Sequence, residues 1–289
     1  MDHRGMIIRP PSEAGSILLQ VTLGCSHGKC AFCGAYRDKR FAVKDRETVM
    51  ADIGFAARSC RDQRRVFLCD GDAMIMPQPR LSDVLGQIRE RLPWVTRVGT
   101  YANAKSLARK SDAELSELRG LGLGIVYMGL ESGDDAILRA MNKNGDSAFI
   151  VEQGRRVRRA GMKLNVTVIN GLGGAARSMD HARATAEALN AMEPDQVGAL
   201  SLMPVPGTPL HDWWERGEFV LPDARGMLAE VREMLFRLEL KRGLFLANHA
   251  SNYLPLKVRL PSGKLSALAE IDNALAGLSP LKAESARRL

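Results

Sequence analysis

The sequence has few cysteines, no long apolar run and no apolar core near its first residue. None of its apolar stretches approaches the roughly 20 residues that a membrane span needs. Residues 1–16, MDHRGMIIRPPSEAGS, do not resemble a signal peptide. Only five of the 289 residues are cysteine, and a chain of this length buries enough surface without a disulfide framework. We therefore expect a cytoplasmic protein with no membrane partner.

The composition excludes several other protein classes. Hydrophobic residues make up 45% and charged residues 26% of the chain, which is ordinary for a globular protein and excludes disorder, collagen and coiled coil. The net charge is +8, but the basic residues are scattered, and their densest groups at 36–40, 58–65 and 155–159 read as helix ends and solvated faces. The positive charge leaves a tRNA partner open but does not favour one over a small-molecule substrate.

Short apolar segments alternate with longer segments of helical periodicity, and this alternation predicts an α/β fold with a parallel sheet. The expected strands are 17–23, 65–70, 96–101, 123–130, 163–169 and 196–203, and the expected helices are 45–59, 81–92, 111–120, 147–160, 178–192 and 223–240.

Polar and glycine-rich residues follow nearly every expected strand. An open sheet and a barrel both fit the alternation, but in a barrel these strand ends converge on one mouth. Six βα units are fewer than the usual eight, so we expect a partial (βα)6 TIM-like barrel with a short C-terminal cap. The core would span 1–245, with an N-terminal extension at 1–15, and the cap and tail would span 246–289.

Three of the five cysteines lie within nine residues and form the pattern C-x4-C-x2-C at Cys25, Cys30 and Cys33. Three thiolates this close repel one another unless a cation holds them, so the spacing predicts a metal site. A structural zinc site takes four protein ligands, and His27, the available fourth, sits between two of the cysteines and would strain the loop. Three cysteines without a good fourth partner favour a 4Fe–4S cluster with one open iron.

Four further segments follow expected strands and carry motif-like residues. They are Asp70-Gly71-Asp72, Gly129-Leu130-Glu131-Ser132-Gly133, the glycine-rich run 168–174, and 204–209. Together with the cysteine loop, they resemble the radical S-adenosylmethionine (radical SAM) superfamily, as a stand-alone core similar to its MiaB- and NifB-like subfamilies. The first cysteine gap is one residue longer than the usual C-x3-C-x2-C. Asp70 and Asp72 stand where the superfamily carries a Gly-Gly-Glu-like motif.

The resemblance implies that the three cysteines hold a 4Fe–4S cluster and that S-adenosylmethionine is the second cofactor. It places cofactor-binding roles on residues at the cysteine loop and at the strand ends. These are Phe32, Gly71, Asp72, Glu131, Ser132, Asn170, Gly171 and Val205. For Asp72 and Glu131, a helix cap or a surface ion pair is the structural alternative.

Candidate catalytic residues are polar side chains expected near the barrel mouth. Two follow the third strand, and three lie in the segment 248–257, which either contacts substrate or caps the barrel. They are Tyr101, Asn103, His249, Asn252 and Tyr253.

The implied function is reductive cleavage of S-adenosylmethionine to a 5′-deoxyadenosyl radical, which abstracts hydrogen from a small molecule or a modified nucleoside. A reductant such as flavodoxin or ferredoxin is the implied partner. The outcome of the reaction, as a lyase, isomerase or oxidoreductase, stays open. The alternatives are an iron–sulfur carrier or assembly protein, and a zinc-stabilised barrel that binds nucleic acid without catalysis.

Overall fold

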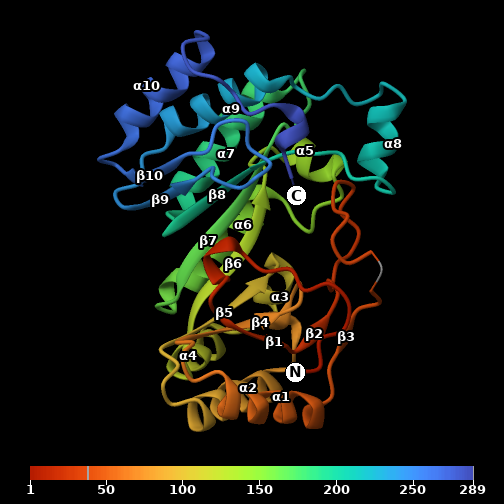
Figure 1. The fold of residues 1–289 in the computed structure, drawn as a ribbon, viewed down its shortest axis with the longest axis vertical. Coiled ribbons are helices and arrows are strands. Elements are labelled where there is room, and N and C mark those ends of the chain that lie inside the picture. The colour runs from red at the N-terminus through yellow and green to blue at the C-terminus, as the bar shows by residue number, and fades with distance from the viewer. Residues whose placement is uncertain (38, 289) are drawn as a thin grey trace. The chain divides into compact units, whose positions relative to one another are not determined.

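A computed structural model describes residues 1–37 and 39–288 of the chain, which divide into two compact units. The first unit contains 1–28, 35–128 and 153–164, and the second contains 29–34, 129–152 and 165–289. Each unit has its own share of the strands and helices (Figure 1).

The first unit is built on parallel strands that follow one another in the order β1, β4, β5, β6. Their bounds are β1 Ile17–Gln20, β4 Arg65–Cys69, β5 Arg97–Ala102 and β6 Leu123–Glu131, the last of which runs on into the second unit. Helices α1 (Arg46–Ser59) and α2 (Gln78–Arg91) pack against each other, and α2 also packs against α4 (Asp112–Gly120). The short elements are η1 Pro11–Glu13, β2 Thr22–Leu23, β3 Ala42–Val43, η2 Ala73–Ile75 and α3 Ala104–Ala108.

Local signals start two of these helices where the sequence predicts them. The Asp45 carboxylate accepts a hydrogen bond from the backbone N–H of Thr48, so α1 begins directly after it. Ser111 and Glu114 form a reciprocal capping box at the start of α4. The expected helices at 45–59 and 111–120 are confirmed to within one residue.

One face of the first unit's sheet is covered by residues 1–9, which we call the N-terminal strap. Ile7 packs against the buried cluster of Phe67, Ile125 and Tyr127. The backbone N–H of Arg4 donates to Gln20 Oε1 at 2.8 Å, and Gln20 Nε2 donates back to the Arg4 carbonyl at 3.2 Å. The strap is therefore held largely by its own backbone, against side chains that rise from the sheet.

The second unit carries strands β7, β8 and β9 in parallel order, with β10 antiparallel to β9. Helix α9 packs against both α7 and α10. The bounds are α5 Asp135–Ala140, α6 Ser147–Arg159, β7 Lys163–Asn170, α7 Ser178–Met192, β8 Gln196–Ser201, α8 Pro209–Glu215, α9 Ala224–Arg237, β9 Gly243–Leu246, β10 Lys257–Leu260, α10 Lys264–Leu275 and η3 Glu284–Ala286, with α6 and the start of β7 reaching into the first unit.

The α/β fold with a mostly parallel sheet is confirmed, and several element bounds differ from those expected. The expected strand 17–23 ends at Gln20, because Thr22 and Leu23 pair with β3 in a separate antiparallel ladder. The expected helix 223–240 ends at Arg237. The expected cap and tail at 246–289 contain a strand and a helix that were not among the expected elements, β10 and α10. The division at residue 245 stays a prediction, and β9 crosses it.

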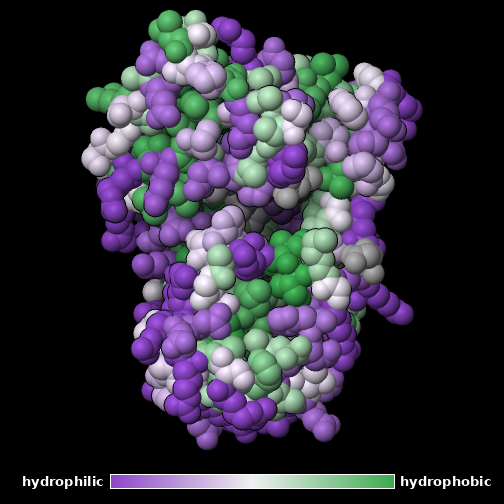
Figure 2. Space-filling view, in the orientation of Figure 1, coloured by the Kyte–Doolittle hydropathy of each residue, from purple (hydrophilic) through white to green (hydrophobic). Residues whose placement is uncertain are grey.

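No helix among the described residues is long and apolar enough to cross a membrane. Figure 2 shows hydrophilic residues over much of the visible surface, with hydrophobic residues in smaller groups between them. This distribution agrees with the ordinary globular composition.

Gly5 tests how the N-terminal strap is held. It has φ +66°, and a Cβ built on it would lie 2.5 Å from Lys39 Cε. We expect Gly5→Ala to disfavour the bound strap by about 1 kcal/mol, since only glycine adopts this conformation freely. Hydrogen–deuterium exchange of the peptide covering residues 1–13 would then be several-fold faster than in the wild type.

Gly86→Ala is the matched control, because a Cβ on this α2 residue meets nothing within 4 Å. Alanine favours a helix over glycine, so this variant should keep the wild-type exchange of the strap and raise the melting temperature. Equal exchange of the strap in Gly5→Ala and the wild type would contradict the role given to Gly5.

Candidate functional site

The cysteine loop carries three thiol side chains. Cys25 follows β2 in the first unit, whereas Cys30 and Cys33 belong to the second. All three are partly exposed. Three accessible thiols in this spacing form a donor set that fits an iron–sulfur cluster. Cys69, in contrast, is fully buried in β4, and burial raises the pKa of its thiol, so it is a core residue as expected.

The loop is fixed by its backbone in both units. Gly24 has φ +67°, and a Cβ there would lie 3.1 Å from the Lys39 carbonyl. In the second unit, the N–H of Ala31 donates to the Met141 carbonyl at 2.9 Å, and the Ala31 carbonyl accepts from Leu210 at 3.0 Å. These bonds tie the segment between Cys30 and Cys33 to the ends of α5 and α8.

Two of the expected cofactor-binding residues lie against this loop segment within the second unit. Phe32 packs against a buried cluster that includes Leu172 and Leu202. A Cβ on Gly34 would lie 2.5 Å from Val205 Cγ1, so Val205 covers the glycine that follows Cys33. The structure thus brings Phe32 and Val205 to the same segment.

Asp72 is the centre of a buried polar cluster in the first unit. Its Oδ2 accepts hydrogen bonds from Asn103 Nδ2 at 2.7 Å and from the hydroxyls of Ser26 and Ser106. Its Oδ1 is buried and has no hydrogen-bond partner in the described part of the chain. Burial raises the pKa of Asp72 to about 6, against the opposing effect of the hydroxyl bonds.

Sequence reasoning missed Ser26 and Ser106 and gave Asn103 a different role. Asn103 caps α3 by accepting from the N–H of Ser106 at 2.9 Å and also donates to Asp72. The Asn103 side-chain oxygen therefore caps α3, its nitrogen bonds to Asp72, and its catalytic role stays a prediction. The only signal for Ser26 was its position directly after Cys25.

Tyr101, the other candidate on the third expected strand, lies in an aromatic cluster. Its ring centroid is 5.1 Å from that of Phe67 and 6.1 Å from that of Tyr127, in edge-on arrangements. Burial raises the pKa of its phenol. The structure does not bring the Tyr101 side chain together with Asn103 and Asp72, and its catalytic role stays a prediction.

Gly71 is required by close packing. A Cβ on it would lie 2.8 Å from the Tyr36 ring and 3.2 Å from Cys25 Cβ. Its N–H donates to the Gly24 carbonyl at 3.1 Å. The backbone after β4 therefore runs directly beside the first cysteine.

Glu131 ends β6 in a strained conformation, with φ +66°. Its Oε1 lies 2.9 Å from Lys143 Nζ, and Gly129 leaves the space through which its carboxylate folds back. Glu131 therefore forms an ion pair, which is the structural alternative to cofactor binding. Its cofactor-binding role stays a prediction.

Ser132 belongs to a buried chain of polar groups. His181 lies 3.0 Å from the Ile169 carbonyl through Nε2 and 2.7 Å from Ser132 Oγ through Nδ1. Burial lowers the pKa of His181 to about 4, so the ring is neutral, with Nε2–H donating and Nδ1 accepting. The Ser132 hydroxyl also accepts from the N–H of Asp134 at 3.0 Å, so its bonds serve the strand end.

Asn170, the last residue of β7, is fully buried. Neither side-chain atom of its amide finds a hydrogen-bond partner among the residues described. The next residue, Gly171, donates its N–H to Glu230 Oε1 at 2.6 Å. Buried amides are nearly always bonded, which makes Asn170 the strongest ligand-binding candidate in the second unit.

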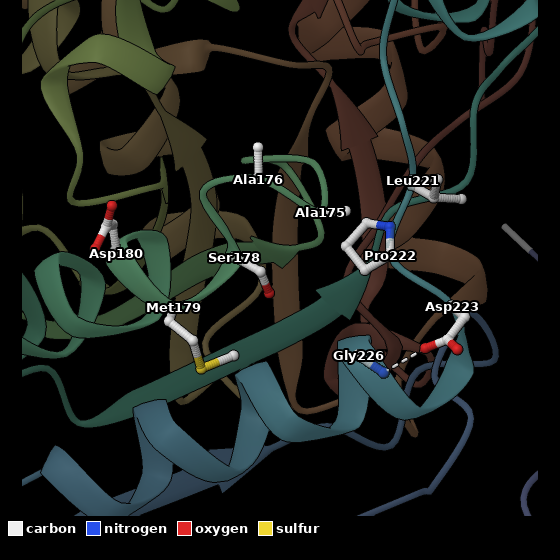
Figure 3. A pocket seen from close by; sticks show the side chains of 9 residues that line it. All are labelled: Ala175, Ala176, Ser178, Met179, Asp180, Leu221, Pro222, Asp223 and Gly226. Carbon is white, nitrogen blue, oxygen red and sulfur yellow. Dashed lines mark hydrogen bonds between the residues drawn. The ribbon is translucent and has the colours of Figure 1, made fainter. Parts of the chain in front are cut away.

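A hollow of about 520 Å³ lies beside this glycine-rich segment, at the first turns of α7 and α9 (Figure 3). The Asp223 carboxylate accepts from the N–H of Gly226, and the Ser178 hydroxyl donates to Glu230 at 2.5 Å. None of the expected site residues lines it. The lining residues are Ala175, Ala176, Ser178, Met179, Asp180, Leu221, Pro222, Asp223 and Gly226.

The segment 248–257 uses its polar side chains within the chain. Asn252 accepts from the Ser201 hydroxyl at 3.0 Å and donates to the Ala199 carbonyl at 2.9 Å. The Tyr253 hydroxyl accepts from Arg287 at 2.7 Å, and the guanidinium lies 4.2 Å from the ring centroid. His249 Nδ1 accepts from the N–H of Ser251 at 3.2 Å. These contacts support a capping role, and catalytic roles for the three residues stay predictions.

Comparisons with known proteins agree with this architecture. The Radical SAM superfamily matches residues 19–189. The chain is 28% identical over 233 residues to biotin synthase from Parafrankia sp. (strain EAN1pec), which covers 81% of this chain and 60% of that protein. It therefore spans less than two thirds of that relative's length.

Solved structures share the fold. Methylornithine synthase (PylB) has a TM-score of 0.55 at 16% identity, over 76% of this chain and 62% of its own. Coproporphyrinogen III oxidase (HemN) from Escherichia coli has a TM-score of 0.55 at 16% identity, over 76% of this chain and 51% of its own.

Glu230 gives a testable dependence of stability on pH. Burial raises its pKa to about 7 from an ordinary 4.5. Such a carboxyl contributes stability that is complete below the unfolded pKa and is lost as the pH rises through about 7. We expect the wild-type melting temperature to fall as the pH rises from about 4.5 to about 7, the range between the unfolded and folded pKa values, and to fall less in Glu230→Gln, which cannot ionise.

Glu233→Gln is the control on the same helix, where the carboxylate is partly exposed and its pairing with Arg237 and Arg183 lowers its pKa. Its pH profile should parallel that of the wild type. A Glu230→Gln profile identical to the wild type would show that Glu230 is not the group that titrates.

Proposed function

Because this chain belongs to the radical SAM superfamily, we propose that it is an enzyme that reductively cleaves S-adenosylmethionine and abstracts hydrogen from a small-molecule substrate. The observation that carries the proposal is the C-x4-C-x2-C spacing of Cys25, Cys30 and Cys33, which lies inside the matched region 19–189. When bound, a 4Fe–4S cluster supplies the electron that breaks the C5′–S bond and yields a 5′-deoxyadenosyl radical. The superfamily match favours this enzyme over the zinc-stabilised barrel and the carrier protein.

Cys25, Cys30 and Cys33 would hold the cluster as thiolates. The backbone bonds of Ala31 described above keep the segment between the last two cysteines in place. A fixed loop reduces the rearrangement needed when the metal binds. The positive φ of Gly24 turns the chain into this loop.

Asp72 would accept an N–H from the amino group of S-adenosylmethionine through Oδ1. That oxygen is buried without a partner in the described chain, whereas Oδ2 is held by three donors. A carboxylate whose second oxygen is fixed in this way is oriented in advance for one further donor.

In the second unit, Asn170 would bind the cofactor through an amide that offers both a donor and an acceptor. The proposal also includes the strand-end residues Glu131, Ser132, Gly171 and Val205. It further includes Phe32, the residue before the third cysteine. Their packing and hydrogen bonds support positioning of the backbone.

For partners, we propose a small-molecule substrate and a reductant of the flavodoxin or ferredoxin class. The relative named biotin synthase favours a small molecule over tRNA, because the biotin in its name is a small molecule.

The direct experiment is an anaerobic assay for cleavage of S-adenosylmethionine. The protein is first reconstituted with iron and sulfide and reduced with dithionite, and S-adenosylmethionine is then added. We expect 5′-deoxyadenosine from the wild type and none from Cys30→Ala, which removes one thiolate of the loop. Cys60→Ala is the matched control, because Cys60 is a free cysteine outside the loop, and it should retain the wild-type rate.

Two outcomes would contradict the proposal. One is a colourless protein that binds a single zinc tightly. The other is a brown reconstituted protein in which Cys30→Ala forms 5′-deoxyadenosine as fast as the wild type.

Asp72→Asn tests the proposed contact with the amino group. The amide places a donor where one carboxylate oxygen accepted, so we expect S-adenosylmethionine to bind about tenfold more weakly, as for the loss of one charge-assisted hydrogen bond. Equilibrium dialysis of the reconstituted protein measures this affinity.

Asp83→Asn serves as the comparison, since Asp83 forms an exposed ion pair with Arg46 on the helical side of the first unit. It should bind S-adenosylmethionine as the wild type does. Unchanged binding by a folded Asp72→Asn would remove Asp72 from the cofactor site.

A further inference from the structure

Asp70 is a buried carboxylate that the cofactor chemistry above does not use. It is fully buried at the end of β4, where the superfamily resemblance leads one to expect glycine. Its Oδ2 lies 2.9 Å from Lys39 Nζ and accepts from Gln20 Nε2 at 3.0 Å. Its Oδ1 has no partner within the described ranges. An unbonded buried carboxylate oxygen is costly, so it calls for a ligand or for a structural reason.

Tyr36 presents a second unbonded group beside Asp70. Its hydroxyl is buried and finds no hydrogen-bond partner in 1–37 or 39–288. Its ring lies over Gly71 and has Lys39 Nζ 5.7 Å from its centroid. Because Lys39 Nζ also lies 2.9 Å from Asp70 Oδ2, the Tyr36 ring and the Asp70 carboxylate lie around the same ammonium group.

The backbone conformation of Tyr36 also supports a ligand site. Its φ is +83°, in a region that is uncommon and strained for a bulky residue. Strain of this kind persists where the surroundings hold it, and it concentrates at ligand and active sites. The chain thus accepts strain to bring this phenol over Gly71.

The side chains that hold Asp70 also hold the N-terminal strap. Gln20 Nε2 donates both to Asp70 and to the Arg4 carbonyl. Lys39 Nζ pairs with Asp70 and donates to the Met6 carbonyl. Gly5 passes over the Lys39 stem. The strap therefore covers Asp70, although its own residues from His3 to Met6 are exposed.

We propose that Asp70 and Tyr36 form a substrate-binding subsite, closed by the N-terminal strap, that takes an uncharged group with an N–H or O–H donor, such as an amide or a hydroxyl. This inference rests on the proposed function, because the bound molecule is a substrate only if the chain is the proposed enzyme. Asp70 Oδ1 accepts the donor, and the Tyr36 hydroxyl bonds to the oxygen of the same group.

Charge selects the class of ligand. Lys39 already neutralises the charge of Asp70, so a second cation gains no attraction from an unpaired negative charge. An anion is repelled by the carboxylate oxygen that has no partner. The subsite is distinct in role from the cofactor contacts, because the superfamily motif carries glycine at this position.

The test uses acetamide as the probe, with acetate and ethylammonium as charged probes of similar size, and saturation-transfer difference NMR on the full-length protein. We expect the wild type to transfer saturation to acetamide more strongly than to either ion. In Asp70→Asn, Lys39 and Gln20 fix the amide oxygen and leave its NH2 in place of Oδ1. Acetamide should then bind about tenfold more weakly.

Tyr36→Phe removes only the hydroxyl and keeps the ring that packs on Gly71, so it carries the test if Asp70→Asn does not fold. It should also weaken acetamide binding, whereas Asp83→Asn should not. Melting temperatures establish that each variant is folded.

Three results would overturn the proposal. They are equal acetamide signals in the wild type and both folded variants, transfer to the charged probes as strong as to acetamide, and loss of the acetamide signal when S-adenosylmethionine is added. The last would assign these groups to the cofactor. Neither probe nor readout involves the cluster, so a failure here is distinct from failure to form 5′-deoxyadenosine.

Discussion

The burial of carboxylates is the constraint on which both units of this protein depend. A carboxylate taken out of water must be paired, bonded or protonated. The chain contains several with essentially no exposed surface, and each organises the backbone around it. They are Glu13, Asp70, Asp72 and Glu230.

Two of these carboxylates have both oxygens occupied by the chain itself. Glu13 accepts from the hydroxyls of Tyr127 and Ser16, each at 2.5 Å, and pairs with Arg97. Glu230 accepts from the Gly171 N–H and from Ser178. Fully bonded networks of this kind fix a fold, so these residues belong to the architecture.

The other two have one oxygen held and one left without a partner in the described structure. Asp70 and Asp72 flank Gly71, and that glycine brings the backbone against Cys25. The first aspartate faces Lys39 and the second faces Asn103. The three-residue segment after β4 thereby carries two carboxylate oxygens without a described partner, one on each side of Gly71 in the sequence.

Much of the fold could be predicted from the sequence. The alternation of strands and helices gave the parallel α/β class because buried strands and amphipathic helices differ in hydrophobic period. Capping residues such as Asp45 and Ser111 located helix starts. The short helices α3, α5 and α8 escaped prediction, because five to seven residues carry too little periodicity.

The candidate site could be predicted only where a residue type and its spacing carry the chemistry. The cysteine spacing by itself predicts a metal-binding loop, and the binding of a cluster by Cys25, Cys30 and Cys33 stays a prediction. Ser106 and Lys39 could not be found in the same way, because their partners Asp72 and Asp70 are 34 and 31 residues away. For Asn252, a polar side chain in a suggestive segment turned out to bond to β8.

The N-terminal strap is gripped through its backbone, by the N–H and carbonyl of Arg4 and the carbonyl of Met6, while the Met6 side chain is 75% exposed. Any amino acid offers those same backbone groups. Selection on this contact therefore acts on Gln20 and Lys39, far along the chain from the strap, and leaves most strap side chains free to drift. Among related chains, the exposed strap side chains would vary, while Gly5 and the residues that bond to the strap backbone stayed fixed.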